Sequence, residues 1–252
     1  MILFTSGEVL LWFLNCLRFE YPVPNYCLNK IIKTLSRKKL IKFASNALAD
    51  NVLEVGKPLY ETIKGKWNES YFLNTNPIVL ELACGKGEYS VGLAQVYPNL
   101  NFIGIDVKGD RLAAGSQQAT LLGLTNVAFL RANIEFLQNF FEEGEVAEIW
   151  ITFPDPFNLK KRVRRRLTHP HFLEKYRAVM QKEGLLHLKT DNRELFDFTL
   201  EELSQFGVKD LEATFDLYQS KMHDDHHGIQ TRFEQIFTEK GFPVHYLRGR
   251  FL

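Results

Sequence analysis

From Ile78 onward, short apolar runs of strand length alternate with amphipathic stretches of helix length. This alternation is typical of a mostly parallel sheet covered by helices on both faces, because parallel neighbours need a crossover between them. The sequence therefore predicts an α/β fold. The expected strands cover residues 78–83, 101–106, 127–131, 147–153, 185–189 and 211–217.

Two of the expected helices have clear end signals. One covers residues 88–97 and is stopped by Pro98. The other opens at Pro170, a favoured first helical residue, and is expected to end near Gly184, a residue type common at helix C-termini. The spacing of its apolar residues predicts a buried stripe. The stripe consists of Phe172, Tyr176, Val179 and Met180.

The 252 residues suffice for one α/β domain and leave little room for a second. We assign residues 36–252 to this catalytic domain. Residues 1–35 are interpreted as an extension that is dispensable for activity. Its apolar stretch, residues 9–17, lacks the basic flank of a signal peptide and is shorter than the roughly 20 residues of a membrane span. The sequence therefore predicts no membrane association.

Charge and cysteine usage exclude several classes of protein. The net charge of +1 carries no sign of nucleic-acid binding by itself, so any such sign must come from the local distribution of charge. Cys16, Cys27 and Cys84 form no CxxC pair and are odd in number, which disfavours a disulfide framework and a zinc site. A cytoplasmic location fits best. The histidine-rich segment 223–227 reads as a polar loop, and no metal site is expected.

A glycine-containing turn follows the first expected strand. Glu81 lies near the end of that strand, and Gly85 and Gly87 follow it. Glycines at a strand-to-helix turn let the backbone approach a ligand beyond the carboxyl ends of parallel strands. A tight turn without a ligand would explain the same glycines, so this motif alone is weak.

Three side chains sharpen the prediction towards an adenosine ligand. Asp106 ends the second expected strand, 21 residues after Gly85, where a carboxylate can accept both ribose hydroxyls. Glu81 would repel a pyrophosphate but attract a positively charged amino acid end. Asn133 is placed either to hydrogen-bond an adenine edge or to cap the next helix, and its position alone leaves both open.

The fourth expected strand ends in a Phe-Pro-Asp-Pro turn whose two prolines aim the carboxylate of Asp155. A basic run follows directly, with six cationic side chains among the seven residues 160–166. A solvated face is the usual explanation of such a run. Its place beside the expected pocket favours a phosphate-rich substrate instead. Asp191 and the segment Thr231, Arg232, Phe233 and Glu234 are expected at the same crevice.

Taken together, these motifs resemble the bacterial single-subunit tRNA (guanine-N7)-methyltransferases over about residues 36–250. The resemblance implies a Rossmann-like class I methyltransferase fold with a mostly parallel seven-stranded sheet and helices on both faces. It also implies transfer of the methyl group of S-adenosyl-L-methionine to N7 of the variable-loop guanine of tRNA (position 46). No obligatory protein partner is expected.

The resemblance further implies roles for single residues. Asp155 is expected to be catalytic. The expected cofactor-binding residues are Glu81, Gly85, Gly87, Asp106, Asn133 and Asp155. The expected substrate-binding residues are Lys160, Arg164, Arg165, Arg166, Asp191, Thr231, Arg232, Phe233 and Glu234.

Three positions depart from the family's pattern. Ala83 stands where a first glycine is usual, Phe157 replaces a Trp, and Leu159 occupies the position of a substrate-contacting Lys, a contact that Lys160 could supply. The alternatives are another Rossmann-like RNA methyltransferase, a small-molecule methyltransferase, a catalytically silent tRNA-binding subunit and a nicotinamide dehydrogenase. The last is disfavoured by Glu81 and by an incomplete GxGxxG.

Overall fold

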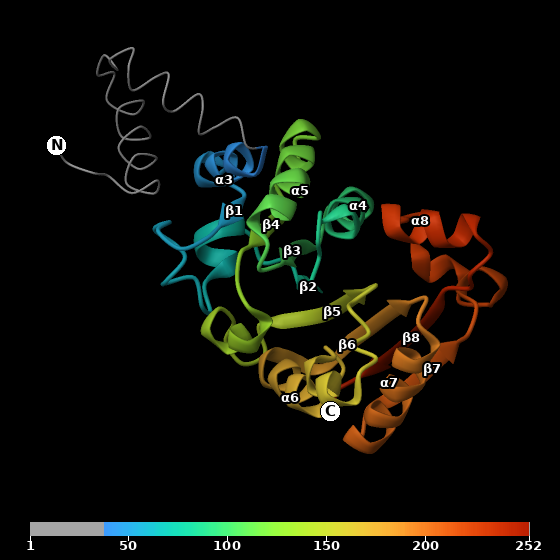
Figure 1. Cartoon of the computed structure of the whole chain (residues 1–252). Coiled ribbons are helices and arrows are strands. Elements are labelled where there is room, and N and C mark those ends of the chain that lie inside the picture. Colours follow the sequence, from blue (N-terminus) through green and yellow to red (C-terminus); the bar gives the residue numbers. More distant parts are fainter. Residues whose placement is uncertain (1–37, 252) are drawn as a thin grey trace, which may run out of the picture. The chain divides into compact units, whose positions relative to one another are not determined.

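The computed structural model describes residues 38–251 (Figure 1). The chain divides into two units, residues 1–45 and 46–252. Within the described residues, the first unit contributes the beginning of helix α3 (Lys38–Leu48), and the sheet lies in the second. The predicted extension over residues 1–35 falls outside the described residues.

One eight-stranded sheet organises the second unit, with the strand order β1-β4-β3-β2-β5-β6-β8-β7. Seven strands point in the same direction, and β8 is antiparallel to both of its neighbours, β6 and β7. The strands are β1 (Val52–Leu53), β2 (Ile78–Leu82), β3 (Asn101–Ile105), β4 (Val127–Leu130), β5 (Val146–Thr152), β6 (Met180–Thr190), β7 (Lys209–Thr214) and β8 (His245–Arg250). The predicted mostly parallel α/β fold is confirmed. The sheet has eight strands rather than the seven that the resemblance implies. The strands expected from the sequence do not include β1, which has two residues, or β8.

Helices cover both faces of this sheet (Figure 1). Helices α4 (Glu88–Val96) and α5 (Gly109–Leu121) lie on one face, and α6 (Pro170–Val179) and α7 (Arg193–Phe206) lie on the other. The remaining elements are the π-helix η1 (Trp67–Phe72), the 3-10 helices η2 (Ile134–Asn139), η3 (Lys160–Arg165), η4 (Leu217–Gln219) and η5 (His223–His226), and α8 (Arg232–Glu239). None of the helices within residues 38–251 is both long and apolar enough to cross a membrane.

Each face of the sheet has its own hydrophobic core. Along β5, Ile149 and Ile151 belong to the core under α6 and α7, whereas Trp150 between them belongs to the core under α4 and α5. Alternate side chains of a strand point to opposite faces, so a strand buried on both sides is apolar at nearly every position. This explains why the central strands appear in the sequence as continuous apolar runs.

The end of helix α6 differs from its prediction. The helix stops at Val179 and the chain passes directly into β6, so Gly184 is a strand residue and not a helix cap. A side chain at Gly184 would lie 2.8 Å from the Met180 methyl and 3.0 Å from the Gln181 carbonyl oxygen. Crowding at an irregular stretch of the β5–β6 pairing therefore requires this glycine. The buried stripe of α6 is confirmed for Phe172, Tyr176 and Val179, whereas Met180 is buried as the first residue of β6.

Candidate functional site

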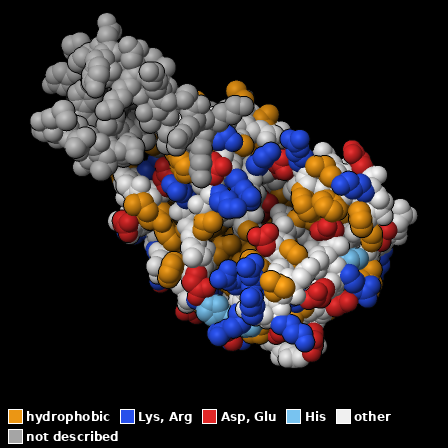
Figure 2. Space-filling model, viewed as in Figure 1, with side chains coloured by type: hydrophobic (Ala, Val, Ile, Leu, Met, Phe, Trp, Pro, Cys, Tyr) orange, Lys and Arg blue, Asp and Glu red, His pale blue; other side chains and the backbone are white. Residues whose placement is uncertain are grey.

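The strand order reverses between β2 and β5, since the chain builds β3 and β4 on one side of β2 before it returns to place β5 on the other. A reversal of this kind opens a crevice at the carboxyl ends of the strands. Figure 2 shows a hollow in the middle of this face with lysine and arginine side chains on both sides of it. The predicted site residues are distributed around this edge.

The turn after β2 is shaped by residues in the left-handed region. Gly85 and Gly87 have φ of 58° and 68°, and Ala83 has φ of 55°. A Cβ on Gly87 would lie 2.3 Å from the Phe129 ring, so a side chain there is excluded. A Cβ on Gly85 would meet no atom within 4 Å, so the backbone there borders open space. Ala83 adopts the glycine-like conformation at a steric cost of order 1 kcal/mol.

Asp106 closes the glycine turn from the next strand. Its Oδ2 accepts a hydrogen bond from Gly85 N at 3.0 Å, and its Oδ1 accepts one from Lys108 N at 2.8 Å. The side chain is nearly buried. Asp106 therefore fixes the backbone of the turn while its carboxylate lies at the carboxyl edge of the sheet, as predicted from its spacing.

Glu81 lies below the turn and is 3% exposed. Its Oε2 accepts hydrogen bonds from the backbone N (2.8 Å) and the hydroxyl of Ser90, and its Oε1 accepts one from Thr152 Oγ1 at 2.7 Å. Burial raises the pKa of Glu81 to about 7, although these hydrogen bonds partly oppose the shift. A cation placed nearby would favour the ionised form. Sequence reasoning missed Ser90 and Thr152.

Asn133 is exposed and caps helix η2, because its Oδ1 accepts a hydrogen bond from Glu135 N at 3.0 Å. Of the two roles predicted for Asn133, the structure therefore shows the helix cap. The cap uses the amide oxygen, and the amide NH₂ group of an asparagine is a separate donor. A second role for Asn133 at an adenine edge stays a prediction.

The turn after β5 combines strain with exposure. Phe153 and Phe157, on either side of Asp155, have φ of 48° and 44°. Non-glycine residues held in this region cost of order 1–3 kcal/mol each and cluster at functional sites. Pro154 is buried and Asp155 is exposed, so the turn presents one carboxylate from a fixed backbone.

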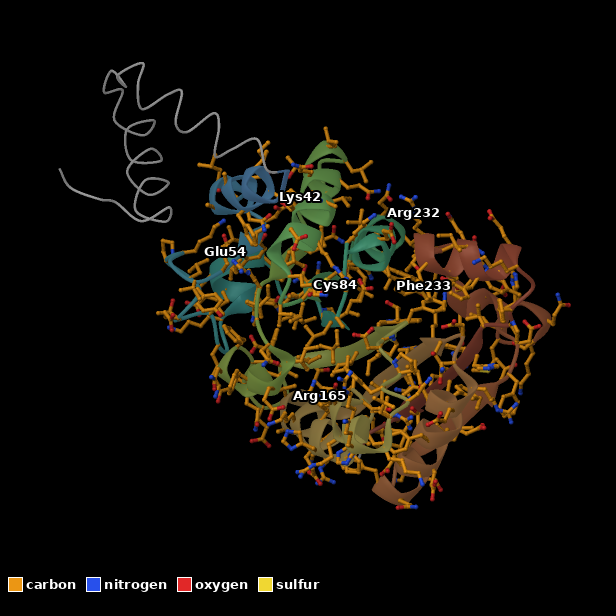
Figure 3. All side chains as sticks on the ribbon, viewed as in Figure 1. Lys42, Glu54, Cys84, Arg165, Arg232 and Phe233 are labelled. Atoms are coloured by element: carbon orange, nitrogen blue, oxygen red, sulfur yellow. The ribbon has the colours of Figure 1, made fainter. Side chains whose placement is uncertain are left out.

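The basic run forms the 3-10 helix η3 and leaves most of its cations exposed. Lys160, Arg164 and Arg165 are all exposed, and Leu159 just before them is 55% exposed. Figure 3 shows Arg165 on the opposite side of the ribbon from Arg232 of α8. This part of η3 is accessible from solvent, and its contact with a polyanion stays a prediction.

Arg166 differs from its prediction as a substrate ligand. Only 2% of it is exposed, and its guanidinium donates to Pro156 O at 2.9 Å and to Glu194 Oε1 at 2.6 Å. It also lies over the Phe198 ring, 4.7 Å from the centroid. Arg166 therefore braces the turn that carries Asp155 instead of facing solvent.

Helix α8 begins beside the glycine turn. Thr231 caps it, with its Oγ1 accepting from Glu234 N at 3.1 Å. Arg232 N donates to Glu88 Oε2 at 3.0 Å, and the Phe233 ring lies 5.5 Å from that of Phe153. The predicted convergence of these segments is thus present in the contacts between α8, α4 and the turn after β5 (Figure 3).

The position of Glu234 disagrees with the prediction that it contacts substrate. Its side chain is 0% exposed and forms an ion pair with Lys189, which is equally buried. The predicted site residue Asp191 follows β6 two residues after Lys189 and is half-buried at the carboxyl edge. Sequence reasoning did not single out Lys189, because a lysine near the end of a strand is usually solvated.

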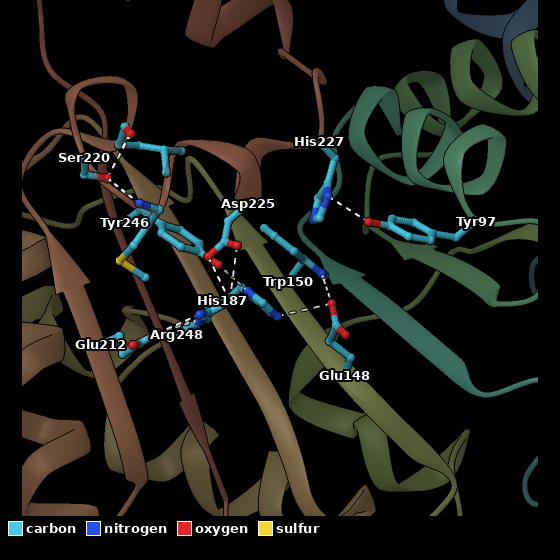
Figure 4. Close-up of polar contacts among 12 residues, drawn as sticks. Tyr97, Glu148, Trp150, His187, Glu212, Ser220, Asp225, His227, Tyr246 and Arg248 are labelled. Atoms are coloured by element: carbon cyan, nitrogen blue, oxygen red, sulfur yellow. Dashed lines mark hydrogen bonds and ion pairs between the residues drawn. The ribbon is translucent and has the colours of Figure 1, made fainter.

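A separate polar network lies on the same face of the sheet, towards the amino ends of β5 and β6 (Figure 4). The Trp150 and His187 rings stack at 3.8 Å, and His187 Nε2 lies 3.2 Å from Glu148 Oε1. His227 of the histidine-rich segment bonds Tyr97 there at 2.9 Å. Within residues 38–251, histidines, cysteines and carboxylates form no group of three suited to a metal ion.

The site thus combines buried carboxylates with an exposed rim of cationic side chains. Glu81 and Asp106 line the glycine turn, Asp155 is presented from the opposite loop, and the exposed cations of η3 lie next to it. Such an arrangement suits a small cationic ligand held at the acidic groups and a polyanion held at the rim.

Comparison with known proteins identifies similar chains. Residues 75–247 match the family described as "Putative methyltransferase". The tRNA (guanine-N(7)-)-methyltransferase of Cytophaga hutchinsonii is 46% identical over 220 residues, which cover 86% of this chain and 99% of that protein. The protein of the same name from Bacteroides fragilis is 42% identical over 218 residues, covering 85% and 86%.

Among solved structures, the 16S rRNA methyltransferase KamB is similar in fold. The TM-score is 0.56 at 17% identity, and the match covers 79% of this chain and 94% of that one. At this identity the likeness concerns the fold alone. It confirms the predicted class I methyltransferase architecture.

Proposed function

This chain belongs to the tRNA (guanine-N7)-methyltransferase family, and from that premise we propose that it transfers a methyl group from S-adenosyl-L-methionine to N7 of a guanine in tRNA. The observation that carries the proposal is the 46% identity to the Cytophaga relative over 99% of that relative's length. We further propose the variable-loop guanine at position 46 as the target and the cytoplasm as the location.

The glycine turn supports a cofactor with a cationic end and a ribose. The open space beside Gly85 leaves room for a ligand to approach the backbone. Glu81 would attract the cationic amino acid end, Asp106 would accept from the ribose hydroxyls, and Asn133 would donate to the adenine. When bound, S-adenosyl-L-methionine supplies an electrophilic methyl group on a sulfonium.

Asp155 and Asp191 would hold the target base. N7 of guanine carries an available lone pair, so the chain needs no strong base and acts by orienting the purine at near-attack distance. A carboxylate can accept hydrogen bonds from guanine N1–H and the exocyclic amine. The purine becomes positively charged on methylation, and Asp155, aimed from its strained turn, would stabilise that charge.

The exposed cations of η3 would bind the tRNA backbone. Arg164 and Arg165 contribute affinity without sequence specificity, because each neutralised phosphate releases counterions. Lys160 would take over the contact that Leu159 cannot make. Thr231, Arg232 and Phe233 would complete the substrate side from α8, while Arg166 supports the site from behind.

The test uses the purified full chain alone, unmodified tRNA and methyl-labelled S-adenosyl-L-methionine, followed by nuclease digestion and identification of the labelled nucleoside. The proposal expects 7-methylguanosine. N1-methyladenosine would assign the chain to a different RNA methyltransferase activity. No labelled product, with cofactor and tRNA both bound, would favour the silent binding subunit.

A further inference from the structure

The fully buried side chain of helix α8 is a charged one. Its buried residue is Glu234, whereas Phe233 and Ile236 of the same helix are 46% and 40% exposed. Glu234 Oε1 lies 2.7 Å from Lys189 Nζ at the end of β6, and both side chains are 0% exposed. A helix that buries a carboxylate in place of a hydrophobic stripe is unusual, because burial of a charge is costly unless it is paired.

Several elements hold this pair in a fixed geometry. The Lys189 ammonium lies 5.0 Å from the centre of the Tyr89 ring of α4. The Tyr218 hydroxyl of η4 donates to Glu234 Oε1 at 2.8 Å and itself accepts from Gln230 Nε2 at 2.8 Å. Glu234 is therefore oriented by groups from β6, from η4 and from the segment before α8.

The ion pair fixes the relative placement of α8 and β6 more than it stabilises the fold. Burial lowers the pKa of Lys189, even though the charge and hydrogen bond of Glu234 oppose that shift. Buried ion pairs are often no more stabilising than an uncharged pair of the same volume, but they specify one relative placement of the elements that carry them.

The placement that Glu234 specifies is that of the first turn of α8. Glu234 Oε2 accepts from Thr231 N at 3.3 Å, which completes a capping box with the Thr231 hydroxyl. Arg232 and Phe233, which follow Thr231, reach the cleft. Arg232 N donates a hydrogen bond to Glu88, and the Phe233 ring packs near Phe153. A shift of Glu234 would therefore move the α8 residues that border the Asp155 turn.

We propose that Lys189 is a positioning residue, which acts through its buried ion pair with Glu234 to hold the first turn of α8 over the tRNA side of the cleft. Lys189 has no exposed surface and does not itself meet the tRNA. This inference rests on the proposed function, because tRNA engagement is the consequence of the placement. It assigns Glu234 to the support of the site and not to substrate contact.

The test is the double variant Lys189→Met/Glu234→Gln in the full chain. Both replacements keep approximate volume, and Gln retains the capping box, so only the charges are removed. Four quantities are compared with the parent chain: the melting temperature, hydrogen exchange of the α8 amides, the half-saturating tRNA concentration, and cofactor affinity. The matched control is Arg193→Met/Asp197→Asn, which removes an exposed ion pair within α7.

The expected result is a melting temperature at or above that of the parent, α8 exchange faster by about tenfold, and a half-saturating tRNA concentration higher by about tenfold. Cofactor affinity should stay within about twofold, and the control should match the parent. Unchanged α8 exchange, unchanged tRNA half-saturation, or an equal loss of cofactor affinity would overturn the proposal.

Tyr218→Phe provides a milder second variant in case the double variant does not fold. It removes one hydroxyl from Glu234 and leaves both charges in place. It should change α8 exchange and tRNA half-saturation in the same direction by about twofold, and no change in α8 exchange would overturn the proposal. Hydrogen exchange needs no catalysis, so it decides the placement of α8 even if the parent chain forms no 7-methylguanosine.

Discussion

The two sides of the cleft hold their functional groups in opposite ways. The glycine-loop wall (Glu81, Gly85, Gly87 and Asp106) is largely buried, and its two carboxylates already accept hydrogen bonds from neighbouring backbone N–H groups. The basic wall (Asp155, Lys160, Arg164 and Arg165) is exposed. Its rigidity comes from behind, through the buried Arg166 guanidinium.

This difference matches the two kinds of ligand. A small ligand gains most from donors and acceptors fixed in advance, because few contacts must supply its whole affinity. A polyanion gains from several exposed cations on a firm support, because each phosphate adds a similar, screened increment. Variants on the two walls should therefore affect different steps of the reaction.

The largest expected effect comes from Asp155→Asn on the basic wall. Asn keeps the size of the side chain but lacks the charge that would stabilise the methylated purine. The single-turnover methylation rate should fall by roughly 10²–10³, with tRNA and cofactor affinities changed by less than about threefold. The control is Asp210→Asn. Asp210 is an exposed carboxylate on β7 with a left-handed backbone that Asn also tolerates, so this variant should retain the parental rate.

A smaller effect is expected from Asp106→Ala on the glycine-loop wall. The substitution removes the acceptor for Gly85 N and Lys108 N and the proposed ribose contact. A loss of about 2 kcal/mol corresponds to roughly 30-fold weaker cofactor binding, with tRNA binding preserved. Calorimetric titration measures both. Parental cofactor affinity would show that the carboxylate only shapes the turn.

Two variants separate the arginines that bind tRNA from the arginine that supports the Asp155 turn. Arg164→Ala/Arg165→Ala should weaken tRNA binding by about tenfold and make its salt dependence shallower by about 0.7–0.9 for each phosphate that is no longer neutralised. Arg166→Ala should instead lower the melting temperature and the methylation rate, since it releases the Pro156 carbonyl beside Asp155. Equal salt slopes for the double variant and the parent would show that η3 is only a solvated face.

The smallest expected effect is a pH dependence from Glu81. Because burial raises its pKa to about 7, the side chain is protonated below that pH and meets a cation best above it. Affinity for S-adenosyl-L-methionine should rise about fivefold from pH 6 to pH 7 and level off above pH 8. Glu81→Gln should flatten this profile. A parental profile in that variant would assign the titration to another group.

The same raised pKa affects stability without cofactor, with a defined sign. The folded chain binds the Glu81 proton more tightly than the unfolded chain does. The resulting stabilisation is therefore complete below the ordinary pKa of the carboxyl, at about pH 4.5, and is lost as the pH rises through about 7. Glu81→Gln should show no such decline over this window.

The glycine-loop wall could be predicted from the sequence because its geometry is local. The glycines stand at a strand-to-helix turn, and Asp106 stands at the end of the next strand, so spacing along the chain predicts their position at one edge of the sheet. The Asp155 turn was predictable for the same reason. Its prolines restrict the backbone wherever the rest of the chain lies.

The residues that support the basic wall could not be predicted in this way. Nothing in a run of like charges distinguishes Arg166, which turns inward to Glu194, from its exposed neighbours. Glu234 has the sequence signature of a capping residue, and its burial depends on Lys189, which is distant in the sequence. Only the fold brings such partners together, so the sequence predicts the type of residue but not its exposure.

The most direct test of the proposed activity is methyl transfer to two tRNAs that differ by one atom of one base. The first carries guanine at position 46, and the second carries 7-deazaguanine, in which a carbon replaces N7. We predict that the full chain binds both tRNAs with similar affinity and transfers a labelled methyl group from S-adenosyl-L-methionine to the first alone. Equal methylation of the 7-deazaguanine tRNA would contradict this prediction, because the methyl acceptor would then be another atom.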